Sequence, residues 1–434
     1  MVHDRSSAAS EASAASEASA ALVACASSAR SASVAMAKAG TEQKNRALLG
    51  GAELIEADAA TILEANATDV DRAQAAGTSS TVIDRLRLSE ARVGSMAEGL
   101  RQVAALADPV GEIVDGWVRP NGLRISRIRV PLGVIGIVYE NRPNVTSDAA
   151  GLCLKSGNAV MLRGSSGAIS SNGAIALLLR QALVGADLPP DGVVLVGDTS
   201  RAVAREFMRL RGYIDCLIPR GGPSLIASVL DEATVPFVID GDGNCHVYVD
   251  ESADLDMAVS IVANAKTQRP SVCNAAESLL VHSAVASAFL PRVARALVGV
   301  ELVGDHATRS ALEGVAEVGP ASADDYAAEF LDLKLSIAVV ESLDCAIDHI
   351  RRFGSGHSEA IVTSDVQAAS RFTREVDAAA VLVNASTRFV DGGEFGFGAE
   401  IGISTQKLHA RGPMGLRELT TLKYIVQGEG QVRT

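Results

Sequence analysis

Three short apolar stretches, Ala159-Val-Met-Leu, Val193-Val-Leu-Val and Ile214-Asp-Cys-Leu-Ile, decide the fold class of this chain. The segments between them, from about residue 167 to 188 and from 200 to 210, have the composition and spacing of helices. Apolar strands that alternate with helices predict a parallel sheet with helices on both faces. The pair Gly221-Gly222, after the third strand, leads into a further helix.

A second α/β run begins near Val235. Its expected strands cover residues 245–249, 279–281, 335–340 and 381–383. We therefore expect an α/β protein with two doubly wound parallel-sheet domains, one for a cofactor and one for catalysis. In such folds the ligand binds where the carboxyl ends of the strands face a cleft.

The segment before these modules has a different character. Residues 1–20 are almost pure Ser, Ala and Glu, a low-complexity tail that either continues as a helix or stays disordered. Residues 21–106 have the apolar spacing of helices and are rich in alanine, which buries little area, so these helices must pack closely. The alternation from Leu123 to Arg129 predicts a strand with an exposed basic face, and Val134 to Tyr139 predicts a more buried strand.

The composition excludes several classes of protein. A formal net charge of −13 over 434 residues argues against nucleic acid or an anionic membrane as a partner. We expect no run long and apolar enough to span a bilayer, and no secretory signal in an N-terminus that carries Asp4, Glu11 and Glu17. The six cysteines form no C-x-x-C pair and no zinc spacing, which indicates reduced thiols in the cytoplasm and no metal site.

The stretch Lys266-Thr-Gln-Arg-Pro-Ser-Val-Cys-Asn, residues 266–274, predicts a nucleophile. It places Cys273 in a turn after an amphipathic helix and before an apolar strand, within reach of a small molecule. The thiolate is the reactive form, and turn N–H groups together with Lys266 and Arg269 would favour it. The alternative is a buried structural cysteine. Cys245, which starts a strand, is a rival nucleophile that we rank lower.

Several long motifs together resemble the gamma-glutamyl phosphate reductases of the aldehyde dehydrogenase superfamily. They follow the family order and cover nearly everything after Ala21; the motifs are residues 129–146 (RVPLGVIGIVYENRPNVT), 243–250 (GNCHVYVD), 266–274 (KTQRPSVCN), the stretch from 349 to 361, and 400–416 (EIGISTQKLHARGPMGL). The resemblance implies an aldehyde-dehydrogenase-like fold. It also implies NADPH-dependent reduction of L-glutamyl 5-phosphate to L-glutamate 5-semialdehyde and phosphate, the second step of proline biosynthesis from glutamate.

The resemblance also implies the chemistry. Cys273 would attack the acyl carbon to give a thioester, which the cofactor then reduces. Asn144 matches the asparagine that helps to bind the oxyanion in the superfamily, although an N-cap of the helix that follows is an alternative role. Hydrolytic relatives need a glutamate base, and residues 235–244 contain none, which suits a reductase; Asp240 or Asp242 would have to reach further.

Cofactor contacts are expected from five residues. Arg163 ends a strand where the superfamily has a lysine at the adenosine ribose, and a cation there favours NADPH over NADH. Arg220, Gly221 and Gly222 precede a helix whose N-terminus suits phosphate. Glu400 matches the glutamate that holds the nicotinamide ribose. A solvated loop charge for Arg220 and a surface carboxylate for Glu400 are the alternatives.

The substrate carries anionic groups, for which Arg142, His246, His357 and Arg411 are candidate partners, although a lone histidine is more often structural. The expected domain boundaries are 1–20 for the tail, 21–118 with 138–234 for the cofactor domain, 235–400 for the catalytic domain, and 119–137 with 401–434 for an oligomerisation arm. An exposed strand edge there predicts at least a dimer. Transient contact with glutamate 5-kinase stays open. Two rival functions remain: a hydrolytic or CoA-acylating aldehyde dehydrogenase, and a non-catalytic subunit with this fold.

Overall fold

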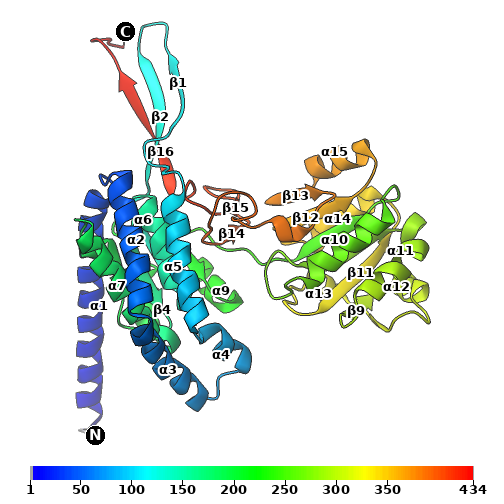
Figure 1. Ribbon diagram of the computed structural model, residues 1–434, viewed down its shortest axis with the longest axis horizontal. Coiled ribbons are helices and arrows are strands. Elements are labelled where there is room, and N and C mark those ends of the chain that lie inside the picture. Colours follow the sequence, from blue (N-terminus) through cyan, green and yellow to red (C-terminus); the bar gives the residue numbers. More distant parts are fainter. Residues whose placement is uncertain (1–2, 434) are drawn as a thin grey trace. The chain divides into compact units, whose positions relative to one another are not determined.

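The structure, a computed structural model, describes residues 3–433, with side chains for 16–80 and 82–433. The chain divides into two compact units (Figure 1). Unit 1 contains Met1–Ile239, Phe397–Gly402 and Met414–Thr434, and unit 2 contains Asp240–Gly396 and Ile403–Pro413. The predicted α/β class with parallel sheets is confirmed, and each unit is described below by itself.

Unit 1 is built on a four-stranded sheet in which all strands are parallel. Its strand order is β5-β4-β3-β6, from β5 (Val193–Leu195), β4 (Ala159–Gly164), β3 (Val134–Tyr139) and β6 (Cys216–Arg220). One hydrophobic core joins this sheet to α1 (His3–Met36), α8 (Arg201–Phe207) and α9 (Pro223–Glu232). Two more helices, α6 (Asn144–Lys155) and α7 (Ile169–Gly185), also pack on the sheet.

The remaining helices of unit 1 pack outside α6 and α7. They are α2 (Thr41–Ala57), α3 (Ala59–Ala75), α4 (Ser80–Leu86) and α5 (Glu90–Ala105), and the short 3₁₀ turns η1 (Ser166–Ala168) and η2 (Pro190–Gly192) precede α7 and β5. The sequence predicts no apolar run of membrane-spanning length, but residues 166–185 reach it by length and composition. Half of the most apolar window of that helix is buried, and α7 packs against α2 and α3, as the core helix of a folded domain does.

The Ser/Ala-rich tail is part of a helix. Helix α1 runs without interruption from His3 to Met36, so of the two alternatives for the tail the helical one holds. Ala26 and Ala29 are fully buried and α1 contacts β3 and β4. Because these side chains are small, the helix axis can lie close to the sheet, as the composition requires.

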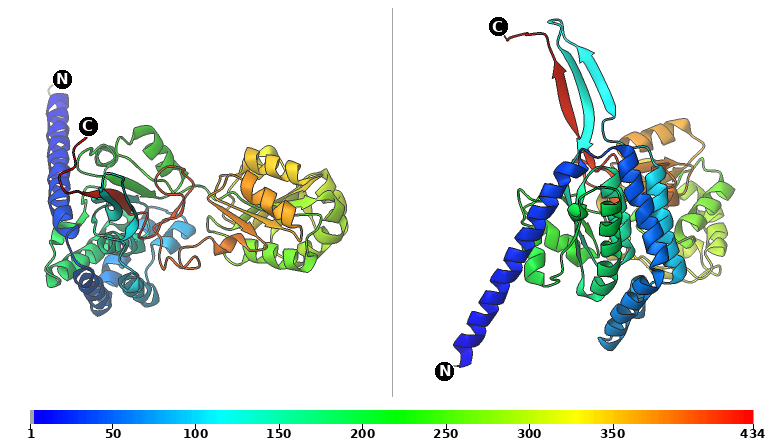
Figure 2. Two further views of the ribbon diagram at one scale, coloured as in Figure 1. Left: turned by 90° about the horizontal axis from the view of Figure 1, so that it is seen from above. Right: turned by 60° about the vertical axis from the view of Figure 1, so that its left-hand side comes forward.

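A three-stranded antiparallel sheet forms the arm of unit 1 (Figure 2). Its order is β1-β2-β16, from β1 (Ile113–Val118), β2 (Arg124–Pro131) and β16 (Thr420–Gln427). These bounds differ from the predicted arm of 119–137 with 401–434. Val134–Tyr139 is buried at every position as the inner strand β3, and Ile403–Pro413 belongs to unit 2.

Unit 2 is built on a seven-stranded parallel sheet of order β10-β9-β11-β8-β7-β12-β13. The strands are β7 (Cys245–Val249), β8 (Ala276–His282), β9 (Glu301–Gly304), β10 (Val318–Pro320), β11 (Lys334–Val340), β12 (Ser358–Val362) and β13 (Ala380–Val383). Strands β9, β10 and β12 were not predicted. The first two strands are short. Strand β12 begins with the polar residues Ser358 and Glu359, so its sequence does not look like that of a buried strand.

Helices line both faces of this sheet. One core holds α10 (Leu255–Thr267), α11 (Ser283–Ala296) and α12 (His306–Ala311), and a second holds α14 (Leu343–Phe353) and α15 (Val366–Glu375). The short elements of unit 2 are α13 (Ala323–Ala327), the 3₁₀ turn η3 (Thr387–Phe389), and the strand pair β14 (Ile403–Ser404) and β15 (Gly412–Pro413). The nucleophile candidate lies between α10 and β8.

Candidate active site

Cys273 lies in the turn that joins α10 to β8. The residue is partly exposed, whereas Asn274 after it is buried. The Ala275 N–H donates to the Val272 carbonyl at 3.0 Å, which closes the turn around Cys273. A helix and a central strand therefore fix the backbone, while solvent still reaches the residue, as the sequence predicts.

Strand β7 and the loop before it hold the backbone of this turn. A Cβ on Gly243 would lie 1.7 Å from the Cys273 carbonyl oxygen, so no other residue fits at Gly243 without a shift of the backbone. The Cys245 thiol donates to that same oxygen at 3.1 Å. The Gly243 N–H in turn donates to the Glu329 carboxylate at 2.8 Å. The sequence identified neither Gly243 nor Glu329 as part of the site.

A buried ion pair joins the end of α10 to the start of β8, the two elements that this turn connects. Lys266 Nζ lies 2.5 Å from Glu277 Oε2, and both side chains are fully buried. Burial lowers the pKa of Lys266 and raises that of Glu277, and the attraction between them opposes both shifts. The charge of Lys266 is therefore paired with Glu277 in the interior of unit 2. This corrects its predicted role as a cation that faces the thiolate.

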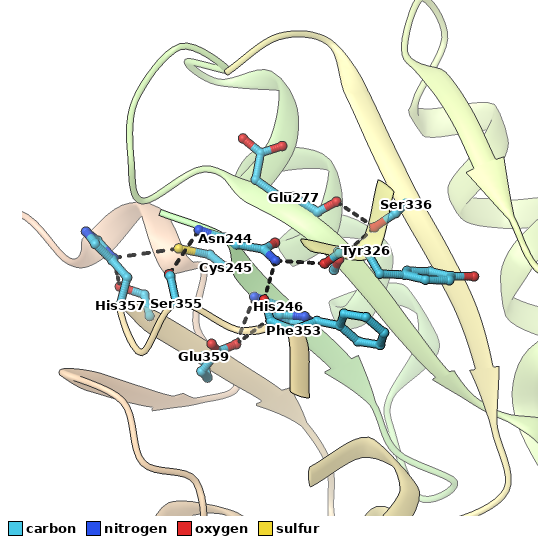
Figure 3. A network of polar contacts seen from close by, with 12 residues as sticks. Asn244, Cys245, His246, Glu277, Tyr326, Ser336, Phe353, Ser355, His357 and Glu359 are labelled. Atoms are coloured by element: carbon cyan, nitrogen blue, oxygen red, sulfur yellow. Dashed lines mark hydrogen bonds and ion pairs between the residues drawn. The ribbon is translucent and has the colours of Figure 1, made fainter. Parts of the chain in front are cut away.

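The two neighbouring cysteines differ in accessibility. Cys245 is fully buried, and burial raises the pKa of its thiol well above the ordinary value. Its Sγ lies 3.6 Å from His357 Nδ1 in the polar network behind the turn (Figure 3). A cysteine acts as a nucleophile in its thiolate form, and the buried environment of Cys245 disfavours that form. Cys273 therefore remains the better candidate nucleophile. Cysteines 25, 153, 216, 245, 273 and 345 are all free thiols.

The two histidines proposed as substrate contacts are fully buried in unit 2. His246 bonds through Nδ1 to Glu359 Oε2 at 3.0 Å (Figure 3). His357 Nδ1 lies 2.7 Å from Ser358 Oγ. Burial lowers the pKa of His357 to about 4, so this ring is neutral near pH 7. His357 therefore supplies no positive charge, and the network that includes both rings supports the strands behind Cys273.

Asn144 is the first residue of α6 in unit 1 and is exposed. The N-cap position belongs to Pro143, and no side chain caps the helix there. The Asn144 amide instead donates through Nδ2 to Asp148 Oδ2 at 2.9 Å. The predicted alternative of an N-cap role is therefore wrong. The amide is available at the surface of unit 1 and is oriented by one carboxylate.

Arg163 ends β4, as predicted, and its guanidinium is turned toward the chain before α8. Its Nη2 donates to the carbonyls of Thr199 at 2.6 Å and Ser200 at 2.9 Å. Its Nε is buried and has no partner among the described residues. Burial lowers the pKa of this arginine. A buried donor without an acceptor is unusual in a folded protein, so the hydrogen bonding of Arg163 is incomplete in this structure.

The start of α9 carries the other predicted cofactor residues. Arg220 ends β6, Gly222 is the N-cap of α9, and the Gly222 N–H donates to Glu140 Oε2 at 3.1 Å. A Cβ on Gly221 would lie 2.7 Å from the same oxygen. An internal carboxylate thus already uses one donor at the site predicted for phosphate, which weakens that expectation. Glu400 lies in the 397–402 segment, within unit 1.

The two arginine candidates for the substrate lie in different units. Arg142 lies between β3 and α6 in unit 1, and its carbonyl accepts from the Val145 N–H at 3.0 Å. Arg411 lies in unit 2, where its Nη2 is 2.8 Å from Asp377 Oδ1. Arg411 would have to leave this ion pair to bind an anion.

No glutamate replaces a hydrolytic base in residues 235–244. The carboxylate of Asp240 accepts from the Ile403 N–H at 2.8 Å, which ties it to β14. Outside this segment, the carboxylate of Glu329 accepts from the Gly243 N–H at 2.8 Å. Burial raises the pKa of Glu329.

One further arginine near the turn escaped the sequence analysis. Arg388 lies in η3, and its Nε donates to Gln268 Oε1 at 2.8 Å. The two residues are separated by 120 positions in the sequence. No local sequence pattern indicates this contact, because it forms only when the folded chain brings the segment after β13 next to the turn.

Comparison with known proteins identifies the family of the chain. The profile of the aldehyde dehydrogenase family matches residues 2–330. The gamma-glutamyl phosphate reductases of Carboxydothermus hydrogenoformans and Thermobifida fusca are 57% and 56% identical to the chain over 407 residues, covering 93% of this chain and 97% of each relative.

Solved structures give the same result. The crystal structure of gamma-glutamyl phosphate reductase from Thermotoga maritima matches with a TM-score of 0.93 and 50% identity, over 95% of this chain and 100% of that one. An acetylating aldehyde dehydrogenase from Geobacillus thermoglucosidasius shares the fold, with a TM-score of 0.70 at 16% identity, over 97% of this chain and 99% of that one. The chain is therefore an oxidoreductase of the aldehyde dehydrogenase family and belongs, within it, to the gamma-glutamyl phosphate reductases.

Proposed function

We propose that this chain uses NADPH to reduce L-glutamyl 5-phosphate to L-glutamate 5-semialdehyde, through a thioester on Cys273, in proline biosynthesis from glutamate. One observation carries the proposal. In a chain of this family, Cys273 is a partly exposed cysteine on a turn that Gly243, Cys245 and the Lys266–Glu277 pair all hold in place. A positioned and accessible thiol is what an attack on an activated acyl group requires.

The first half of the reaction is acyl transfer to sulfur. The Cys273 thiolate attacks the acyl carbon, the C–O bond to the phosphoryl group breaks, and phosphate leaves with the electron pair. The oxygen of the tetrahedral intermediate carries a negative charge, which we assign to the Asn144 amide and a backbone N–H at the nucleophile. Asp148 orients the Asn144 amide before the reaction through the bond at 2.9 Å.

The second half of the reaction returns the thiol. A nicotinamide cofactor held by the residues of unit 1 would supply the hydride for the thioester carbon. The hemithioacetal on Cys273 then collapses, which releases the aldehyde and leaves the sulfur ready for the next cycle. With Asp240 tied to β14 and Glu329 to Gly243, neither carboxylate is placed as a free base for water. The absence of a free base at these two positions would slow hydrolysis of the thioester.

Unit 1 would hold the cofactor. Arg163 fits a phosphate-bearing ribose best, because its buried Nε lacks a partner and its charge suits the 2′-phosphate that distinguishes NADPH from NADH. We assign the nicotinamide ribose to Glu400. We keep Arg220, Gly221 and Gly222 as phosphate contacts, although Glu140 would have to yield the Gly222 N–H.

The arm of unit 1 fits assembly with a second copy of the chain. Trp117 and Tyr424 are exposed and meet edge to face with ring centroids 6.4 Å apart, next to the exposed side chains of Val118 and Val426. Strands β1 and β16 are the edges of the sheet. An apolar strand edge is a natural site for pairing between chains. Contact with glutamate 5-kinase stays a prediction from the family.

The decisive test is the reverse reaction in the presence of inorganic phosphate. The wild-type chain should form NADPH from NADP and glutamate 5-semialdehyde only when phosphate is present, and Cys273→Ala should lower this rate by at least about 10³-fold. Cys345→Ala is the matched control, because this thiol is exposed and lies on α14. Oxidation that needs CoA or no phosphate would support the rival enzymes, and normal turnover by Cys273→Ala would refute the thioester.

A further inference from the structure

Two arginines flank the turn that carries Cys273. Arg269 belongs to the turn and is exposed, and Arg388 approaches from η3 and is half-buried. Neither arginine makes an ion pair with any residue in the described part of the chain. The bond from Arg388 to Gln268 uses only Nε, which leaves the paired terminal nitrogens of the guanidinium for another acceptor.

The segment that carries Arg388 is fixed to the turn at two points. Gln268, which precedes Cys273 in the sequence, accepts from Arg388. Asn274, which directly follows Cys273, donates through Nδ2 to the Val390 carbonyl at 2.9 Å. Within η3 the Ser386 hydroxyl accepts from the Arg388 N–H at 3.3 Å. The Arg388 backbone is therefore held on the turn by contacts on both sides of Cys273, and its guanidinium has little freedom to move away.

The charge of Arg269 and the thiol of Cys273 both influence the pKa of Arg388. Burial and repulsion from Arg269 lower the pKa of Arg388, and Asp391 and the thiols Cys273 and Cys245 oppose this shift. Asp391 is already an acceptor for the N–H groups of Gly393 and Glu394. Repulsion between two like charges is relieved when an anion lies between them. The two arginines therefore favour an anionic ligand next to the turn that carries the sulfur.

We propose that Arg269 and Arg388 form the subsite for the phosphoryl group of the acyl phosphate, and for inorganic phosphate in the reverse reaction. This inference rests on the proposed function. The forked guanidinium of arginine suits phosphate oxygens because it offers two parallel N–H donors. As Cys273 attacks the acyl carbon and the C–O bond breaks, the charge that develops on the departing phosphate falls between the two arginines.

The first experiment needs no turnover. Iodoacetate and iodoacetamide alkylate the same thiol, but only iodoacetate is an anion, so the ratio of their rates at Cys273 reports positive charge near the sulfur. Peptide mapping by mass spectrometry measures both rates in the full-length chain. We expect the ratio at Cys273 to exceed that of a free thiol, phosphate to slow both reactions, and Arg388→Gln to raise the protective phosphate concentration by about tenfold or more.

Three variants make this result specific. Arg309→Gln on α12 removes an exposed arginine of the same unit and should leave the ratio and the protection unchanged. Arg388→Lys keeps the charge without the fork, so it should keep the iodoacetate preference but lose most of the phosphate protection. Arg269→Gln should change both in the same direction as Arg388→Gln, and it provides the test if the half-buried Arg388 position fails to fold.

The second experiment uses phosphate-dependent semialdehyde oxidation. Arg388→Gln should raise KM for phosphate by about tenfold or more, with KM for the semialdehyde nearly unchanged. The opposite pattern would place the substrate carboxylate at the arginines and overturn the proposal, as would unchanged phosphate protection. If wild-type protein oxidises no semialdehyde, the proposed function fails, but the alkylation experiment still decides whether an anion subsite exists.

Discussion

The turn around Cys273 and the start of α6 at Asn144 are held in place in different ways. Cys273 sits on a turn that is fixed by a glycine contact, a buried thiol and a fully buried ion pair. Asn144 sits at the exposed start of a helix, and one carboxylate orients its amide. The nucleophile is thus fixed by the interior of unit 2, whereas the proposed oxyanion donor is fixed by a surface bond.

This difference separates two kinds of mutational effect. Changes behind Cys273 disturb a buried network and must affect folding as well as activity, because buried polar groups depend on all their partners. A change at Asn144 removes a surface contact, so it should affect the chemical step and leave stability nearly unchanged. The predictions below test this separation.

The largest effect is expected from Lys266→Met. It leaves the Glu277 carboxylate buried without its partner, which should lower the free energy of unfolding of unit 2 by about 3–5 kcal/mol. Hydrogen exchange of peptides from β7 and β8 along a urea series measures this quantity. Lys334→Met is the matched control, since its ion pairs with Glu301 and Asp325 are more exposed and should cost at most about 1 kcal/mol. A similar loss in both variants would contradict the importance of burial.

Asn144→Ala should lower kcat without lowering the stability of the protein. Loss of one donor to an oxyanion lowers kcat by about 10²–10³-fold, or roughly 2.7–4 kcal/mol. KM should change little, and the rate of Cys273 alkylation by iodoacetamide should not change. Steady-state kinetics and peptide mapping provide both values. If kcat stayed normal while the protein lost stability, Asn144 would be a structural residue of α6 instead.

The sequence was sufficient for features that are encoded locally. The strand and helix alternation over 159–218 and the turn at Cys273 follow from short patterns, and both occur where expected. Strand β12 escaped detection because Ser358 and Glu359 are polar, although both are fully buried. Their burial depends on partners far along the chain, such as His246 for Glu359, and no local pattern shows that.

The site residues show the same limit. His246, His357 and Lys266 were identified as sources of positive charge from their motifs, but the fold buries all three, and Lys266 and His246 each face a glutamate. Gly243 and Arg388 were not identified as site residues, because each contacts the turn only after the chain has folded. Residue type thus identified candidates for the chemistry of the site, but it did not show which side chains remain accessible.

Gly243→Ala tests how closely the turn must be positioned. The new methyl group would overlap the Cys273 carbonyl, so the turn must move, and a displacement of about 1 Å at a reacting group can cost about 10²-fold in rate. We expect kcat/KM to fall by about that factor. Gly173→Ala is the control, because a Cβ at Gly173 on α7 would meet no atom within 4 Å. Equal activity in the two variants would show that the turn tolerates movement.

The smallest effect is expected at Asp148, a positioning residue that acts through Asn144. Asp148→Ala removes the acceptor that orients the amide and should lower kcat by about tenfold, the equivalent of one charge-assisted hydrogen bond. Asp148→Asn keeps an acceptor and should recover most of the rate. The experiment measures kcat for both variants and for wild type between pH 5 and pH 8.

The pH profile separates orientation from simple packing. Although solvent reaches Asp148, the surrounding protein raises the pKa of its carboxyl to about 6, while bonds from Asn144 and Ser147 oppose that rise. Above this pH the ionised carboxylate accepts from Asn144, and below it protonation weakens the bond, so wild-type kcat should fall as the pH drops through about 6. Asp148→Asn cannot titrate and should lose this limb of the profile. If the limb persisted in Asp148→Asn, another group would control it, and the Asn144 amide would be held without help from Asp148.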